Sequence, residues 1–179
     1  ALGNGQYTPR SSPSNVQGLT SGVSAIAIGG YHSCALMSAT GGVKCWGYNY
    51  DGQVTGTTSV VPTPEDATGL TSGVAFIAAG SSTTCAITTT GGAKCWGYNA
   101  YGQIGNGSTA SPVRTPADVT GLSSGVVAMA LGGAGTCALL STGAVKCWGY
   151  LFGLTPTTVS GLASGAGPRL LRATPGSRS

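Results

Sequence analysis

The chain has 179 residues, of which 41% are hydrophobic, only 7% are charged and 32 are glycine. The glycines follow no three-residue period and the apolar residues recur regularly, so neither a collagen-like chain nor simple disorder is expected. No apolar segment approaches the roughly 18 residues of a membrane-spanning helix, and we expect no membrane span. The net charge of +4 depends on Arg169, Arg172 and Arg178. The rest of the chain lacks the clustered basic stripe that a nucleic-acid partner requires, so we do not expect such a partner.

From the N-terminus onward the chain is organised as a repeat of about 51 residues. Residues 1–17 form a partial repeat, repeats 1 and 2 occupy 18–68 and 69–120, and a shortened repeat 3 occupies 121–160. Residues 161–179 begin a fourth repeat and continue as a tail unrelated to it. The composition of this tail does not decide between an ordered and a disordered segment. The motif KCWGY recurs at Lys44, Lys94 and Lys146, in steps of 50 and 52 residues. Self-similarity at such a period is typical of propellers, solenoids and arrays.

Each repeat predicts about four short strands. A strand of small residues begins at Val23, Val74 or Val126, and its alanines suit a crowded innermost position where backbones approach closely. Two cysteine-containing strands follow, joined by a Gly turn, and then a Gly-Gln loop and a Pro/Thr-rich segment. These segments predict an all-β fold made of β-propeller blades, each with about four antiparallel strands.

The six cysteines occur as one pair in each repeat. Cys85 and Cys95 are centred on Thr90, where the Gly turn falls, so they are expected directly opposite each other with Cβ atoms about 4.5–5.5 Å apart, near enough for a disulfide. Zinc ligation is the alternative, but nine or ten intervening residues and a single histidine do not match zinc motifs. We therefore expect three disulfides, no metal site and an oxidising compartment. The expected pairs are Cys34–Cys45, Cys85–Cys95 and Cys137–Cys147.

The remaining polar residues indicate no catalytic centre. His32 is the only histidine, and its counterparts in the other repeats are Thr83 and Gly135. No acidic partner lies near it in sequence, and no nucleophile elbow or phosphate-binding loop is present. We expect no enzyme activity and no cofactor. Asp66 and Asp118 are repeat equivalents beside a Pro-containing turn, where local hydrogen bonding is expected.

Two further residue types recur once per repeat. Each tryptophan follows a cysteine, and we expect these side chains to pack between neighbouring blades, with ligand binding as the alternative. Each KCWGY motif also begins with a lysine, which predicts either a ring of charges on one rim or solvated strand positions. These residues are Trp46, Trp96 and Trp148, and Lys44, Lys94 and Lys146.

The loops beyond each tryptophan are the candidate protein-binding surface. They are rich in tyrosine and asparagine, which suit protein contacts when a rigid scaffold supports them. Ordinary turn structure is the alternative explanation for the asparagines. The candidate residues are Tyr48, Asn49, Tyr50, Tyr98, Asn99, Tyr101, Tyr150, Leu151 and Phe152.

The order of these motifs, GLxSGV, AIAxGxxHxCAL, GGVKCWGYN and GQxGNG, resembles the repeats of the regulator of chromosome condensation family over about residues 1–165. The resemblance implies blades of a seven-bladed β-propeller, and the cysteine-bearing CWGYN variant is similar to the bacterial, exported branch. Three and a fraction repeats cannot close a seven-bladed ring alone. An incomplete ring is therefore expected: part of a longer chain, an open arc, or a partial propeller that further copies complete.

These observations favour a secreted or cell-surface, non-catalytic module that binds another protein through its loops. The resemblance implies nucleotide-exchange, chromatin-binding and enzyme-capping roles, of which the paired cysteines argue against a nuclear one. The alternative is a structural repeat of an extracellular fibre or adhesin, or a self-assembling partial propeller, because open blade edges invite association. A third hypothesis is an incomplete gene product, suggested by the short third repeat.

Overall fold

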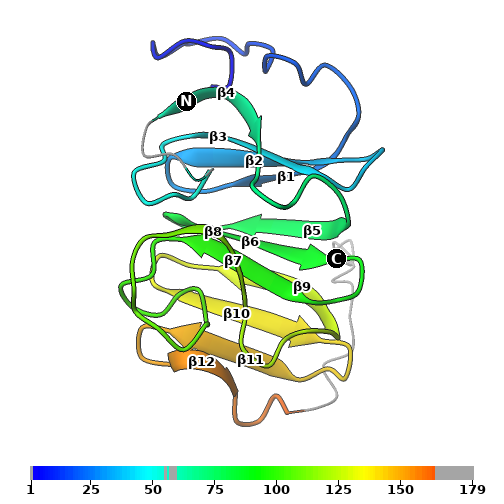
Figure 1. Ribbon diagram of the computed structural model, residues 1–179, viewed down its shortest axis with the longest axis vertical. Coiled ribbons are helices and arrows are strands. Elements are labelled where there is room, and N and C mark those ends of the chain that lie inside the picture. The colour runs from blue at the N-terminus through cyan, green and yellow to red at the C-terminus, as the bar shows by residue number, and fades with distance from the viewer. Residues whose placement is uncertain (1, 55, 57–59, 164–179) are drawn as a thin grey trace, which may run out of the picture.

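A computed structural model describes residues 2–54, 56 and 60–163. In these residues the chain forms twelve strands and no helix, arranged as three antiparallel sheets of four strands each (Figure 1). Blade 1 contains β1 (Val23–Ile28), β2 (His32–Met37), β3 (Val43–Gly47) and β4 (Val61–Asp66). Blade 2 contains β5 (Val74–Ala79), β6 (Thr83–Thr88), β7 (Ala93–Gly97) and β8 (Val113–Asp118). Blade 3 contains β9 (Val126–Leu131), β10 (Gly135–Leu140), β11 (Val145–Gly149) and β12 (Gly153–Thr158).

The strand order in each sheet follows the order in the chain, so every blade is a meander. The predicted all-β fold of four-stranded blades in an open array is confirmed. Each sheet lies within one predicted repeat, at residues 23–66, 74–118 and 126–158. Residues 164–179, which include most of the predicted fourth repeat and tail, lie outside the described residues.

The central hairpin of each blade has the register that the cysteine spacing predicts. Cys85 pairs directly with Cys95 across β6 and β7, and the two Cα atoms are 4.1 Å apart. Gly91 takes the positive φ of +81° that closes the turn, and its N–H donates to the carbonyl of Thr88. All three predicted disulfides are present: Cys34–Cys45, Cys85–Cys95 and Cys137–Cys147.

The hydrophobic core lies between blades rather than inside any one of them. The strands β1 and β2 contact β5, and β5 and β6 contact β9, so the blades stack face to face in chain order (Figure 1). One buried cluster joins blades 1 and 2 and includes Leu36, Ile77 and Trp96. A second cluster joins blades 2 and 3 and includes Ile87 and Trp148. Only blade 2 is therefore covered on both faces by the described chain.

Candidate functional site

One rim of the stack carries a band of aromatic side chains from all three blades. At this rim the loop after the third strand is tied to the loop before the second strand by one backbone hydrogen bond, from Tyr48 N to Tyr31 O in blade 1. The same bond joins Tyr98 N to Ser82 O in blade 2, and Tyr150 N to Ala134 O in blade 3. Because these tethers are equivalent, the repeat presents its tyrosines at the same edge of each sheet.

The tyrosine rings contact each other in two groups. Tyr48 lies between Tyr31 and Tyr50, with ring centroids 6.0 and 4.7 Å away. Tyr101 of blade 2 meets Tyr150 of blade 3 edge to face at 5.2 Å, and so connects two blades. Leu151 and Phe152 extend the band, and the exposed fraction of Leu151 is 86%. We call the exposed members of this band the aromatic rim: Tyr31, Tyr48, Tyr50, Tyr101, Tyr150, Leu151 and Phe152.

The prediction that Asn49 and Asn99 belong to the contact surface is wrong, because both side chains are fully buried. The Oδ1 of Asn99 accepts a hydrogen bond from Ile104 N at 2.9 Å, and its Nδ2 donates to the carbonyls of Ser108 and Ala110. Asn49 accepts the equivalent bond from Val54 N at 2.9 Å. A long loop that folds back on itself leaves backbone groups without partners, and an asparagine can satisfy them. These residues fix the loops that carry the tyrosines.

Trp96 and Trp148 lie between blades, as predicted, and each is bound to the blade before it, whereas Trp46 of blade 1 lies against the N-terminal segment. Trp96 Nε1 donates to the main-chain carbonyl of Gln53 at 3.0 Å, and Thr84 Oγ1 donates to the same carbonyl at 2.8 Å. In the next interface Trp148 donates to the carbonyl of Gln103 at 2.8 Å. Sequence reasoning treated the Gly-Gln segment as a turn and missed this contact, whose only sequence signal is the recurrence of glutamine at one repeat position.

The glutamine side chains support the rim from below. Gln103 is buried, and its Oε1 accepts a hydrogen bond from Tyr101 N at 2.9 Å. Gln53 makes the equivalent contact with Asp51 N at 3.1 Å. Each glutamine therefore binds the next blade through its main-chain carbonyl and holds the loop at the aromatic rim through its side chain.

His32 lies at the contact between blades 1 and 2. Its Nε2 is 2.8 Å from Thr84 Oγ1, and because that hydroxyl donates to Gln53 O, the imidazole must donate here from Nε2. Burial lowers the pKa of His32 from 6.5 to about 4, since desolvation disfavours the charged ring. The single histidine therefore links two blades as a neutral donor.

Lysines and aspartates pair across the two outer strands. Lys44 Nζ lies 2.7 Å from Asp66 Oδ1, and Lys94 Nζ lies 2.6 Å from Asp118 Oδ1. The sequence indicated neither of these cross-strand ion pairs. Lys146 differs because Thr158 is its cross-strand neighbour.

The described residues contain no group of three or more His, Cys, Asp and Glu side chains that could hold a metal ion. Over the same part of the chain, no helix has the length and apolar character needed to cross a bilayer.

This arrangement defines the class of the molecule: a stack of propeller blades, each closed by a disulfide hairpin and joined to the next by a tryptophan. The sequence matches two protein-family models, both described as the regulator of chromosome condensation (RCC1) repeat. One matches residues 23–53 and 74–103, and the other matches residues 94–139. The chain belongs to the RCC1 repeat family. No curated protein matches the sequence.

Solved structures agree on the β-propeller fold. Human WBSCR16 is 24% identical with a TM-score of 0.73, and the match covers 89% of this chain and 46% of that one. Yeast RCC1 (Prp20), solved bound to Kap60, is 20% identical with a TM-score of 0.67, and the match covers 77% and 37%. A second structure, Prp20p from Saccharomyces cerevisiae, was described with its binding to Gsp1p and histones and matches equally well over 77% and 38%. The chain thus spans less than half of the length of these structures.

Proposed function

We propose that the protein is a non-catalytic binding module that contacts another protein through the aromatic rim, in an extracellular or cell-surface setting. The observation that carries this proposal is the rim itself, where all three blades expose tyrosines and the loops of blades 1 and 2 have buried asparagine and glutamine anchors. Tyrosine supplies a large contact area and a hydrogen-bonding hydroxyl at a low cost in side-chain entropy.

The rigidity of the loops supports this use. Around Tyr101, Asn99 and Gln103 fix the backbone on both sides through buried hydrogen bonds. Loops that are already ordered lose little conformational entropy on binding, so more of the contact energy appears as affinity. The yeast relative Prp20 was solved bound to a protein, Kap60, which is consistent with protein binding by a propeller of this family.

A quantitative pull-down tests the proposal. The baits are the chain, a rim variant carrying Tyr50→Glu, Tyr101→Glu and Tyr150→Glu, and a control variant carrying Thr89→Glu, an exposed residue in the β6–β7 turn at the opposite end of the hairpin. Each is immobilised and exposed to the secreted and surface proteins of the source organism. We expect at least one protein to bind the chain and the control but not the rim variant. Equal retention by all three baits would contradict a binding role of the rim.

The setting is tested separately by counting free thiols. Because all six cysteines are paired, protein purified from its native compartment should gain no mass when alkylated without a reductant. Disulfides persist in oxidising compartments and are rare in the cytosol. Six alkylated cysteines would contradict the extracellular assignment and leave the rim hypothesis standing.

A further inference from the structure

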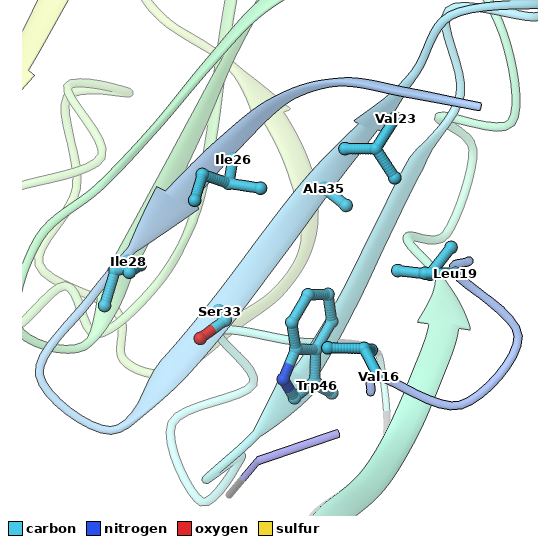
Figure 2. A pocket seen from close by; sticks show the side chains of 8 residues that line it. All are labelled: Val16, Leu19, Val23, Ile26, Ile28, Ser33, Ala35 and Trp46. Carbon is cyan, nitrogen blue, oxygen red and sulfur yellow. The ribbon is translucent and has the colours of Figure 1, made fainter. Parts of the chain in front are cut away.

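The stack of blades ends in two apolar sheet faces that the described chain leaves open. The head face belongs to blade 1 and exposes Ile26 and Ile28, which line a hollow of about 300 Å³ together with Trp46 and with Val16 and Leu19 of the N-terminal segment (Figure 2). The tail face belongs to blade 3 and includes Ala128, Ala130, Leu139 and Val145, which line a hollow of about 210 Å³. Exposed apolar surface of this kind marks an interaction site.

The equivalent positions in blades 2 and 3 show what kind of surface the head face is suited to contact. Ile26 is the fourth residue of β1 and is 67% exposed, whereas Ile77, the fourth residue of β5, is 5% exposed. Ile77 is buried because blade 1 covers that face of blade 2. The equivalent Met129 of β9 is buried by blade 2 in the same way. The head face therefore has the composition of a surface that a preceding blade covers.

The tail face shows the reverse relation. Ala130 of β9 is exposed, whereas its equivalent in β1, Ala27, is 8% exposed beneath blade 2. Val145 is partly exposed in blade 3, while Val43, which begins the matching strand in blade 1, is fully buried. The tail face is thus a surface that a following blade covers.

We propose that the head face of one chain packs on the tail face of a second copy. The contact would repeat the two interfaces inside the chain, between blades 1 and 2 and between blades 2 and 3. Such a head-to-tail contact is heterologous, so it closes into a ring or continues as a chain of copies. Closure by two copies would give six blades, within the roughly four to eight blades of known propellers.

The segment before β1 provides a second, independent reason. In blades 1 and 2, residues 48–60 and 98–112 separate the last two strands, whereas in blade 3 only Tyr150–Phe152 do so. Blade 3 therefore lacks the loop that covers the tryptophan of a following blade. At the head face the N-terminal segment occupies the place of such a loop, because it covers Trp46.

The match between the two loops extends to single contacts. Gly105 packs so closely on Trp148 that an added Cβ would lie 2.6 Å from its Nε1, and Gly3 packs on Trp46 with a corresponding 2.7 Å. Gln17 N donates to Gly3 O as Thr120 N donates to Gly105 O. The head face thus carries the element that the tail face is missing, and the two faces complement each other.

Light scattering over micromolar to near-millimolar concentrations tests the proposal. We expect a species heavier than the 17.4 kDa chain, whose fraction rises with concentration. Ile26→Asp on the head face and Ala130→Asp on the tail face should each abolish it. Both side chains are exposed, so folding is expected to survive, which circular dichroism and a free-thiol count would verify. A mass of one chain at every concentration would overturn the proposal.

Mixing the two variants makes the test specific for head-to-tail geometry. The Ile26→Asp chain keeps its tail face and the Ala130→Asp chain keeps its head face, so the mixture should form a pair with one copy of each that grows no further. Association of either variant by itself would indicate head-to-head or tail-to-tail contact and would overturn the proposal. Tyr101→Asp, on the aromatic rim, should leave association unchanged, which separates this inference from the proposed function.

Discussion

Blade 2 and blade 1 share the same repeat motifs and strand order but have different surroundings. Blade 2 is covered on both faces, and its Trp96 and Ile77 are buried against blade 1. Blade 1 has a neighbour on one face only, and its Ile26 remains exposed. The comparison shows that one repeat is sufficient to form a sheet and its disulfide, whereas the hydrophobic core forms only where two blades are in contact. Stability in such arrays is approximately the sum of repeat and nearest-neighbour terms.

The largest expected difference between these blades concerns their tryptophans. Trp96→Ala should lower the free energy of unfolding by about 3–5 kcal/mol, because it leaves a cavity between two blades and removes the donor to Gln53 O. Trp46→Ala should cost less, on the order of 1–2 kcal/mol, because the N-terminal segment, not a blade, covers this ring. Urea unfolding of the oxidised protein, measured at low concentration, provides both values.

A conservative substitution serves as the control for this prediction. Trp96→Phe keeps most of the ring volume and removes the indole N–H, so it should cost about 1 kcal/mol, the net worth of one hydrogen bond, because Thr84 Oγ1 still donates to the carbonyl of Gln53. Equal losses for Trp46→Ala and Trp96→Ala would mean that the N-terminal segment stabilises a blade as well as a full neighbour does.

The second prediction concerns the pH dependence of the contact between blades 1 and 2. The pKa of His32 is lowered to about 4 in the folded protein from its ordinary 6.5, so between these values the unfolded chain binds more protons. The contribution of neutral His32 is therefore complete above about pH 6.5 and is lost progressively as the pH falls toward 4. The loss should be about 3 kcal/mol across this window.

Blade 2 offers the matched substitution for this test. Thr83 occupies the equivalent position at the start of β6, so His32→Thr places a residue that the repeat already accepts. The variant should be less stable than the parent at pH 7, where the bond to Thr84 is lost, and its stability should vary less between pH 6.5 and 4. An unchanged pH profile would show that other groups dominate the acid response.

The hairpins were predictable from sequence because a strand alternates with period two and a Gly turn fixes its centre. Cys85 and Cys95 therefore had only one register. The roles of Asn99 and Gln103 were not predictable, because the same residue types occur in exposed turns. Asn99 is buried because the loop folds around it. Gln103 binds the next blade through a backbone carbonyl, which every residue possesses.

The open faces were beyond sequence reasoning for a related reason. Ile26 and Ile77 are the same residue in the same strand position, yet one is exposed and the other is buried. Their difference depends only on whether a neighbour is present. Hydrophobic pattern identifies the side of a strand that is suited to burial, but not the element that covers it.

The smallest expected effect separates blade 2 from blade 3. Lys94 pairs with Asp118 across the outer strands, whereas Lys146 faces Thr158. Lys94 is partly exposed and Asp118 is exposed, so Asp118→Ala should cost only about 0.2–1 kcal/mol, and less in high salt. Thr158→Asp should give blade 3 the missing pair and stabilise it by a similar amount.

Thermal unfolding of the two variants at low and high salt measures this difference. Thr158→Ala is the control, because it removes the threonine without adding a charge. A gain from Thr158→Asp that persists in high salt would exceed what a solvated ion pair provides. It would indicate that the carboxylate stabilises the conformation of β12 in addition to its charge interaction with Lys146. This strand is the outer strand of blade 3, in which only residues 150–152 separate the last two strands.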